Sequence, residues 1–287
     1  MPPLVVLVGE TASGKSALAL ELAERVGGEI ICADSRTVYK GMDIGTAKPT
    51  PAERARVPHY GLDEVTPDKS FSAAAFQRLA TDAITDISSR GKLPIMVGGT
   101  GLYIDSVLFG FEFRAPADPA ERERLQAMSI AELQAEIAEK GLPMPENRQN
   151  KRHLTRLLEA GVATAIHKTM RPHTLVLGLS IDRNELRQRI AARTDAMLQA
   201  GFVEEVRRLG EQYGFEVPGL QAPGYKAFHC HLTGELSLEQ ARDEFIKNDL
   251  ALAKRQRTWF KRNSSIQWLN DRSNAVDIVT TFLNKTN

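Results

Sequence analysis

The feature that most constrains the fold is the segment 9–16, which fits the pattern GxxxxGK[ST]. It follows a β-branched run at residues 4–8 and precedes residues 16–26, where apolar side chains recur at helical spacing. In such a strand–loop–helix unit, backbone N–H groups face an anion, Lys15 adds positive charge and the Ser16 hydroxyl can hold Mg²⁺. The segment therefore predicts a site for a di- or triphosphate. Its residues are Gly9, Glu10, Thr11, Ala12, Ser13, Gly14, Lys15 and Ser16.

The rest of the chain alternates predicted strands with predicted helices. The expected strands are residues 29–33, 94–97, 174–180 and 265–269, and the expected helices are residues 73–89, 184–209, 238–261 and a terminal helix. Such alternation indicates parallel crossover units, whose loops gather at the carboxyl ends of the strands. The sequence therefore predicts an α/β fold: a P-loop NTPase-like parallel sheet flanked by helices.

A stretch from about residue 113 to 171 interrupts this pattern. It is rich in Ala, Glu, Arg, Gln and Leu, has no strand signal, and contains the breakers Pro116, Pro119, Pro143 and Pro145. We expect a helical insertion domain here. The core would then comprise residues 1–112 and 172–287, and the insertion residues 113–171.

Composition and charge exclude several classes of protein. Lys and Arg (37) nearly balance Asp and Glu (36), so a polyanionic partner must be held by local patches. The two cysteines, Cys32 and Cys230, form no disulfide framework, which favours a reduced, cytoplasmic setting. No apolar run approaches the roughly 20 residues of a membrane span, and the start of the chain lacks a signal-peptide pattern. We therefore expect a soluble protein with no membrane partner.

Asp34, at the end of the second predicted strand, has three possible roles. It could ligate a metal, act as a general base, or cap a helix. The phosphate loop does not show which diphosphate is bound, because the phosphates of a nucleotide and of a prenyl diphosphate present similar oxygens.

Several blocks of the chain resemble the bacterial tRNA dimethylallyltransferases. They are residues 9–16, residues 34–49 (DSRTVYKGMDIGTAKP), residues 97–103 (VGGTGLY), Arg193 with Met197 and Leu198, residues 224–226, and residues 253–260. The resemblance extends from about residue 4 to residue 269. The 34–49 block is the most specific, because a generic nucleotide kinase has no need of it.

The resemblance implies transfer of a dimethylallyl group from its diphosphate to N6 of the adenosine directly 3′ of the anticodon in tRNA. It makes Asp34 the general base, and it makes Ser16 and Arg193 contacts to the diphosphate beside Lys15. Thr100 would line the channel that the target base enters. Because developing charge on the diphosphate must be stabilised, we also expect Mg²⁺ as cofactor.

The resemblance further implies a set of residues that meet tRNA. Those at the target nucleotide are Asp34, Ser35, Arg36, Thr37 and Thr100; those at the anticodon arm are Arg122, Arg152, His153, Leu154, Thr155, Arg156, Gln221, Gly224, Tyr225 and Lys226. Arg148, Lys151, Arg152, His153 and Arg156 form a basic cluster, for which a solvated helix face is the alternative. The expected partners are the tRNA anticodon stem-loop and dimethylallyl diphosphate, bound by a monomer.

Some positions depart from the family pattern. They are Thr37 in place of Gln, His153 in place of Arg, Pro223 at an apolar position, and Asp249 with Leu250 in place of a Thr-Arg pair. The insertion is also short and lacks a usual Asp-Pro-x-Ala-Ala stretch. We expect these changes to affect the grip on tRNA and the contacts between helices more than the phosphate loop.

Three alternatives remain at this stage. A cytokinin-type adenylate isopentenyltransferase would use the same donor with a free nucleotide, a small-molecule kinase would use the phosphate loop for ATP, and an RNA-binding protein could retain the loop as a relic. Two other features receive structural interpretations. Trp259 and Trp268 are expected to be core or packing residues rather than stacking platforms, and the sequence His229-Cys230-His231 is a weak metal motif.

Overall fold

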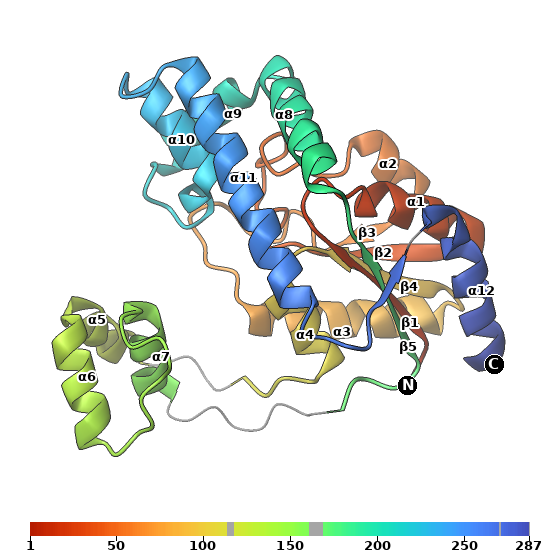
Figure 1. Cartoon of the computed structure of the whole chain (residues 1–287), viewed down its shortest axis with the longest axis horizontal. Helices are drawn as coiled ribbons and strands as arrows, with labels where there is room; N and C mark the ends of the chain where they lie inside the picture. Colours follow the sequence, from red (N-terminus) through yellow and green to blue (C-terminus); the bar gives the residue numbers. More distant parts are fainter. Residues whose placement is uncertain (114–117, 161–168, 270, 287) are drawn as a thin grey trace. The chain divides into compact units, whose positions relative to one another are not determined.

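The computed structural model of the chain describes residues 1–113, 118–160, 169–269 and 271–286. It divides into two compact units (Figure 1). The core unit consists of Met1–Leu108 and Met170–Asn287, and the helical unit consists of Phe109–Thr169. Pro116 and Ala117, near the expected start of the insertion, lie outside the described residues.

The core unit is built on a parallel sheet of six strands. They are β1 (Leu4–Gly9), β2 (Gly28–Ala33), β3 (His59–Tyr60), β4 (Leu93–Gly98), β5 (Thr174–Leu179) and β6 (Gln267–Leu269), in the order β3-β2-β4-β1-β5-β6. Each adjacent pair is parallel. The predicted α/β fold with a parallel sheet is thus confirmed, and the short edge strand β3 was not predicted.

The core unit also contains α-helices. They are α1 (Lys15–Val26), α2 (Pro51–Arg56), α3 (Ala73–Ser89), α4 (Gly101–Leu108), α8 (Arg183–Gln199), α9 (Phe202–Tyr213), α10 (Pro223–Leu232), α11 (Leu238–Phe260) and α12 (Ala275–Thr286). The predicted helices at 73–89 and 238–261 are confirmed. The stretch 184–209 is divided, because Gly201 has a left-handed φ of 96° between α8 and α9. Helices α2, α4 and α10 were not predicted.

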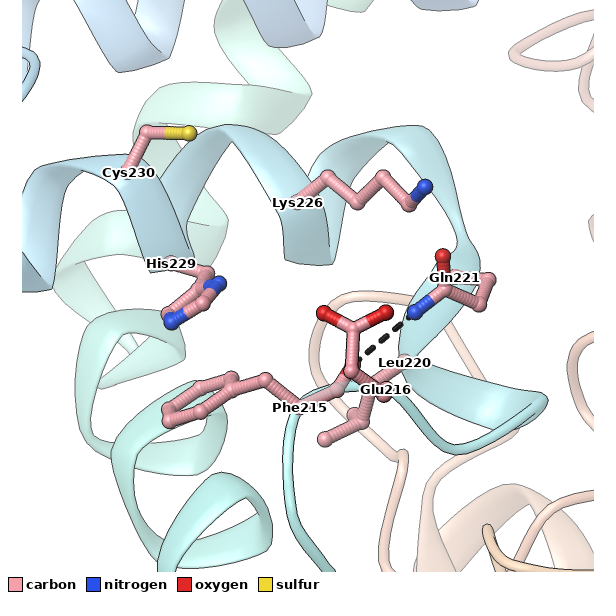
Figure 2. Close-up of a pocket in the computed structure, with 7 residues that line it drawn as sticks. All are labelled: Phe215, Glu216, Leu220, Gln221, Lys226, His229 and Cys230. Atoms are coloured by element: carbon pink, nitrogen blue, oxygen red, sulfur yellow. Dashed lines mark hydrogen bonds between the residues drawn. The ribbon is translucent and has the colours of Figure 1, made fainter.

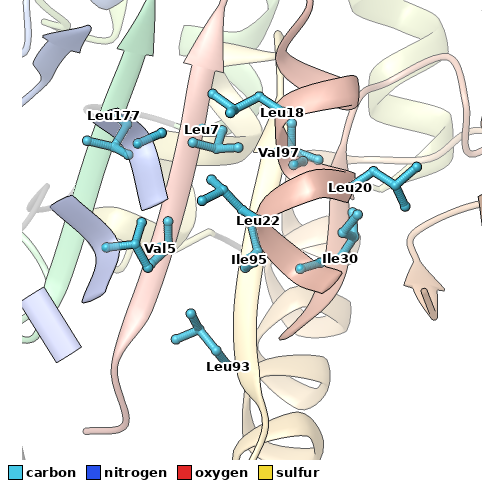
Figure 3. Close-up of a cluster of buried hydrophobic side chains, with 14 of the residues drawn as sticks. Val5, Leu7, Leu18, Leu20, Leu22, Ile30, Leu93, Ile95, Val97 and Leu177 are labelled. Carbon is cyan, nitrogen blue, oxygen red and sulfur yellow. The ribbon is translucent and has the colours of Figure 1, made fainter. Parts of the chain in front are cut away.

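The two faces of the sheet are covered by different helices. On one face, Val5 and Leu7 of β1 pack with Leu18 and Leu22 of α1, and α12 joins the same apolar cluster (Figure 3). On the other, α3, α4 and α11 contact the strands. Burial on both faces explains why the strands read as continuous apolar runs. Each fully buried Val or Leu contributes roughly 1.5–3 kcal/mol, so this core fixes the strand ends firmly.

The register brings three loops to one edge of the sheet. Gly98 of β4 pairs with Val8 of β1 and with Ala33 of β2. A Cβ at Gly98 would lie 2.0 Å from the Ala33 carbonyl oxygen, so only glycine permits this approach. The segments that follow β1, β2 and β4 therefore leave the sheet side by side.

A second apolar cluster supports the segment that follows β2. Phe202 of α9 contacts the rings of Tyr225 and Phe228 of α10, with centroids 5.1 and 5.0 Å away. Buried residues of the 34–49 segment, including Met42, pack in this cluster. A Cβ at Gly45 would lie 2.1 Å from the Phe202 ring, so this segment follows the surface of the cluster closely.

The helical unit contains α5 (Pro119–Ala127), α6 (Ile130–Glu139) and α7 (Lys151–Ala160). Its small core comprises Leu125, Leu133, Ile137, Leu154 and Leu158. Ser129 begins α6 with a capping box, in which its side chain accepts from the Glu132 N–H and Glu132 accepts in return.

Candidate active site

The phosphate loop lies between β1 and α1. Ala12 and Gly14 have left-handed φ angles of 58° and 82°, which curl the backbone ahead of α1. The Ser13 N–H donates to the Glu10 carbonyl oxygen at 3.1 Å, and Lys15 Nζ donates to the same oxygen at 3.1 Å. The loop therefore has the conformation that lets successive N–H groups face an anion.

Side chains from the C-terminal part of the chain brace this loop. The Thr11 N–H donates to Gln256 Oε1 at 2.7 Å, and Gln256 Nε2 donates to the Gly99 carbonyl oxygen at 3.1 Å. Arg257 forms an ion pair with Glu10, and Arg272 Nη2 donates to the Ser13 carbonyl oxygen at 2.6 Å. Sequence reasoning gave these residues no role, although Gln256 and Arg257 lie in a block that carries the resemblance.

Arg193 reaches the loop from α8. Its Nη2 donates to Thr11 Oγ1 at 2.9 Å and pairs with the carboxylate of Asp249 on α11. Arg193 Nε and Ser13 Oγ are buried and have no hydrogen-bond partner within the described part of the chain. Two orphaned donors beside the loop fit an anion that would accept from them.

The surroundings of Lys15 change the pKa of its ammonium group. Burial lowers the pKa of its ammonium group to about 8; the charge of Asp34 opposes this shift, Arg193 adds to it and Glu10 opposes it. A bound diphosphate would favour the charged form of Lys15. The ammonium, the guanidinium of Arg193 and the carboxylate of Asp34 thus belong to one site.

Asp34 directly follows β2, where the chain turns. Its Oδ1 accepts from the Arg36 N–H at 2.8 Å, and the next residues form turns rather than a helix, so the helix-cap interpretation is wrong. Thr100, after β4, accepts from the Ser35 N–H through Oγ1 at 3.0 Å. The structure therefore brings the predicted base, Thr100 and the phosphate loop together.

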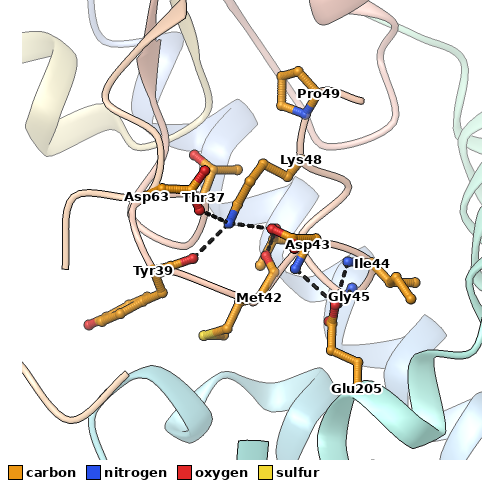
Figure 4. Close-up of polar contacts among 12 residues, drawn as sticks. Thr37, Tyr39, Met42, Asp43, Ile44, Gly45, Lys48, Pro49, Asp63 and Glu205 are labelled. Carbon is orange, nitrogen blue, oxygen red and sulfur yellow. Dashed lines mark hydrogen bonds and ion pairs between the residues drawn. The ribbon is translucent and has the colours of Figure 1, made fainter. Parts of the chain in front are cut away.

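Two buried charged groups hold the 34–49 segment (Figure 4). The fully buried Lys48 ammonium donates to the Tyr39 carbonyl oxygen and forms ion pairs with Asp43 and Asp63, all at 2.7 Å. The Glu205 carboxylate of α9 accepts from three successive N–H groups, beginning at Asp43, at 2.9, 2.8 and 3.0 Å. Sequence reasoning did not identify Lys48 or Glu205.

Tyr225, predicted to meet tRNA, lies inside the protein. It is 2% exposed and its hydroxyl donates to Glu205 Oε1 at 2.6 Å. Burial raises its pKa well above the usual value, and the charge of Glu205 adds to this rise. Gly224 packs closely against Phe245, and Thr37 is also buried. Tyr225 and Thr37 therefore do not present their side chains to solvent.

Gln221 and Lys226 lie at the surface of the same region. They line a hollow of about 140 Å³ together with Phe215 and His229 (Figure 2). The rings of Phe215 and His229 stack with centroids 3.7 Å apart, and Gln221 Nε2 donates to the Phe215 carbonyl oxygen at 2.9 Å. No cluster of three or more potential metal ligands occurs among the described residues, and His229-Cys230-His231 forms none.

The helical unit carries the remaining predicted tRNA contacts. Arg122, Arg152, His153 and Arg156 are exposed, whereas Leu154 and Thr155 are buried. Arg122 lies 3.5 Å from Glu159. The four exposed side chains are therefore accessible to a partner, and the two buried residues stabilise the unit.

One expectation about side chains needs correction. Asp249 and Leu250 were expected to act mainly away from the phosphate loop, yet Asp249 pairs with Arg193 and Leu250 packs in a cluster that includes Ala12. Trp259 was expected as a core or packing residue. It is 36% exposed, but a Cβ at Gly101 would lie 2.3 Å from its ring, and its Nε1 donates to Asp105 Oδ2 at 2.7 Å. Trp268 is half-buried.

Cys32 and Cys230 are both free thiols. Along the described ranges, no helix combines the length and the apolar character that crossing a bilayer requires.

The parallel sheet, the phosphate loop after β1 and the carboxylate after β2 define an α/β protein of the P-loop class. Comparison with known proteins gives the family. The IPP transferase family model matches residues 37–263. The tRNA dimethylallyltransferase of Roseiflexus is 42% identical over 91% of each chain, and that of Bacillus subtilis is 39% identical over 96% of this chain and 93% of its own.

Solved structures agree with these relatives. A tRNA isopentenylpyrophosphate transferase from Bacillus halodurans superposes with a TM-score of 0.76, at 35% identity, over 99% of this chain and 96% of its own. A eukaryotic dimethylallyltransferase acting on tRNA gives a TM-score of 0.83, at 27% identity, over 99% of this chain and 80% of its own. The chain belongs to the IPP transferase family, that of the tRNA dimethylallyltransferases, and is a transferase.

Proposed function

We propose that the protein transfers a dimethylallyl group from dimethylallyl diphosphate to N6 of the adenosine directly 3′ of the anticodon in tRNA, and releases diphosphate. The observation that carries this proposal is the combination of Asp34 with the cations of the phosphate loop in one site. A loop that only bound a nucleotide would not explain the 34–49 segment, which the core unit holds beside it through Lys48 and Glu205.

The donor would be activated through its leaving group. The loop N–H groups other than those of Thr11 and Ser13 can donate to diphosphate oxygens, and so can Lys15, Arg193 and the Ser13 hydroxyl. Their charge and dipoles stabilise the charge that develops as the allylic C–O bond breaks. The hydrogen bonds from Gln256 and Arg272 keep the loop in place before the substrate arrives. The donors of the loop are therefore preorganised for the charge that develops on the diphosphate.

The site also suits Mg²⁺. Mg²⁺ keeps several waters and takes few protein ligands, and Ser16 presents an exposed hydroxyl at the start of α1. When bound there with the diphosphate, the ion would supply positive charge to the leaving group. Ser16 would be its protein ligand.

The acceptor would be deprotonated by Asp34. N6 of adenine is a poor nucleophile until it loses a proton, and a carboxylate at the end of β2 can accept that proton as the new C–N bond forms. Thr100 and Ser35 fix the turn beside it. Because the base must leave its stack to reach this carboxylate, contacts to the tRNA must offset an unstacking cost of a few kcal/mol.

The contacts to the anticodon arm would come from both units. Arg122, Arg152, His153 and Arg156 of the helical unit, with Gln221 and Lys226 of the core unit, are accessible to phosphates and bases. Each phosphate contact would steepen the dependence of log affinity on log salt by roughly 0.7–0.9. We propose that the protein acts in the cytoplasm. We also propose that it acts as a monomer, and light scattering of the purified protein would test the oligomeric state.

Mass spectrometry of nucleosides tests the reaction. Unmodified tRNA is incubated with the protein, Mg²⁺ and dimethylallyl diphosphate, with AMP as a parallel acceptor. Prenylated adenosine from tRNA alone is the expected result. Prenylation of AMP would favour an adenylate isopentenyltransferase, and absence of prenylation with ATP-dependent phosphoryl transfer would favour a kinase.

A further inference from the structure

An ion pair between Arg193 and Asp249 stands directly beside the phosphate loop. A single nitrogen, Arg193 Nη2, donates both to the Asp249 carboxylate and to Thr11 Oγ1. The carboxylate therefore lies within two hydrogen-bond lengths of the loop. Its side chain is 13% exposed, so water screens its charge little.

A carboxylate in this place opposes the binding of an anion. Diphosphate must approach the same guanidinium, and two like charges at short range repel strongly where water is scarce. The neighbouring Leu250 supplies no compensating cation, because it packs in the apolar cluster that includes Ala12. Relative to the Thr-Arg pair of the family resemblance, this edge of the site loses one positive charge and gains one negative charge.

The pair also leaves part of Arg193 accessible. Its Nη2 is used by Thr11 and Asp249, whereas the side chain as a whole is 27% exposed. The guanidinium can therefore begin to contact a diphosphate before the carboxylate releases it. The same arrangement lets Asp249 take the guanidinium back when the product leaves.

We propose that Asp249 is a positioning residue that acts through Arg193 to weaken diphosphate binding. Its carboxylate competes with the diphosphate for the guanidinium and so promotes release of the product. This inference rests on the proposed function of the phosphate loop as the diphosphate site.

The test is calorimetric titration of the purified full-length protein with magnesium pyrophosphate. Asp249→Asn keeps an oxygen that can accept from Arg193 but removes the charge. We expect pyrophosphate to bind about tenfold more tightly, since a like charge has been removed at short range. If Asp249 only ordered Arg193, Asp249→Asn would instead weaken pyrophosphate binding, because Arg193 would be less ordered.

A matched control comes from the other ion pair between the same two helices. Asp195 of α8 pairs with Arg242 of α11 away from the loop contacts described above. Asp195→Asn should leave pyrophosphate affinity unchanged. Asp249→Thr provides a second variant, and melting curves check that each protein is folded.

Steady-state kinetics give an independent readout. In Asp249→Asn and Asp249→Thr we expect a lower KM for dimethylallyl diphosphate and inhibition by pyrophosphate about tenfold stronger, for the same electrostatic reason. If the wild-type protein binds pyrophosphate and the variants bind it equally or more weakly, the role of Asp249 is overturned while the diphosphate site stands. If none of the proteins binds pyrophosphate, the diphosphate site itself is overturned, and this inference with it.

Discussion

The phosphate loop and the 34–49 segment leave neighbouring regions of the same sheet edge, but they are held by different means. The loop takes its shape from local backbone geometry at Ala12 and Gly14, and distant side chains only brace it. The 34–49 segment has no helix or ladder strand of its own, and the buried charges of Lys48 and Glu205 fix it. One region is a local motif; the other depends on long-range contacts.

This difference fits the two tasks that we propose. A diphosphate presents similar oxygens in any molecule, so a general loop with N–H donors suffices. A particular base within a tRNA must be placed against one carboxylate. The 34–49 backbone must therefore keep a fixed conformation, although it has no strand pairing to hold it. Three N–H groups gathered on one carboxylate, Glu205, provide that rigidity.

The largest effect should come from Asp34, where the 34–49 segment begins. Asp34→Asn should lower turnover by about 10²–10⁴, the usual contribution of a positioned general base. Single-turnover assays with tRNA measure it. Pyrophosphate should still bind, because the cations and N–H donors of the loop remain in place. Unchanged turnover would remove Asp34 from the role of base.

A change in the phosphate loop should affect use of the donor and leave tRNA binding intact. Lys15→Met should lower kcat/KM for dimethylallyl diphosphate by about 10²-fold, since one preorganised donor to the leaving group is lost. Affinity for tRNA, measured by filter binding without donor, should change little. Loss of tRNA binding with normal use of the donor would show that the two regions do not divide the work in this way.

Sequence reasoning recovered the local region and missed much of the other. The strand, loop and helix from β1 to α1 are contiguous, so hydrophobic periodicity and one motif predict them. Glu205 acts on backbone atoms of the 34–49 segment and Gln256 on a backbone atom of the phosphate loop, each more than 150 residues away, and no local pattern reveals a contact of that kind. Asp34 stood out as a carboxylate at a strand end, and Thr100 and Arg193 were found through the resemblance. The proximity of the three was not visible from spacing.

The missed helices have local explanations. Helix α10 begins at Pro223 without a side-chain cap, and α4 begins at Gly101 directly after Gly98 and Gly99, in a stretch that reads as a loop. Helix α2 did carry a signal, the capping box of Thr50 and Glu53 with Pro51 at its first turn. Buried tRNA candidates such as Tyr225 were misplaced because a motif identifies residues but not the direction of their side chains.

Lys48 offers a way to loosen one region while leaving the other intact. Lys48→Met should reduce the free energy of unfolding by about 2–3 kcal/mol, less than a fully buried pair would lose, because Asp43 and Asp63 remain partly solvated. Urea unfolding measures the loss. The KM for tRNA should rise, with pyrophosphate affinity unaffected.

Lys40→Met is the matched control, since Lys40 is an exposed lysine of the same segment. It should leave stability within about 0.5 kcal/mol of the wild type. Equal losses in the two variants would mean that the buried ammonium of Lys48 does not hold the segment.

The smallest expected effect is a pH dependence that belongs to the loop alone. Burial lowers the pKa of Lys15 to about 8, with Asp34 and Glu10 opposing the shift and Arg193 adding to it. A diphosphate binds the charged ammonium better, so affinity should fall as pH rises through this value. Between pH 7.5 and 8.5 the charged fraction falls about threefold, and pyrophosphate affinity should follow it.

Calorimetry at several pH values measures this dependence, and Lys15→Met separates it from the titration of pyrophosphate itself. The difference in pyrophosphate affinity between the wild type and Lys15→Met should vanish toward high pH, where Lys15 of the wild type is neutral. A constant difference across this range would mean that Lys15 stays charged in the free site. The charge of the loop would then not change with pH in this range. The contrast between the two regions would concern only their backbones.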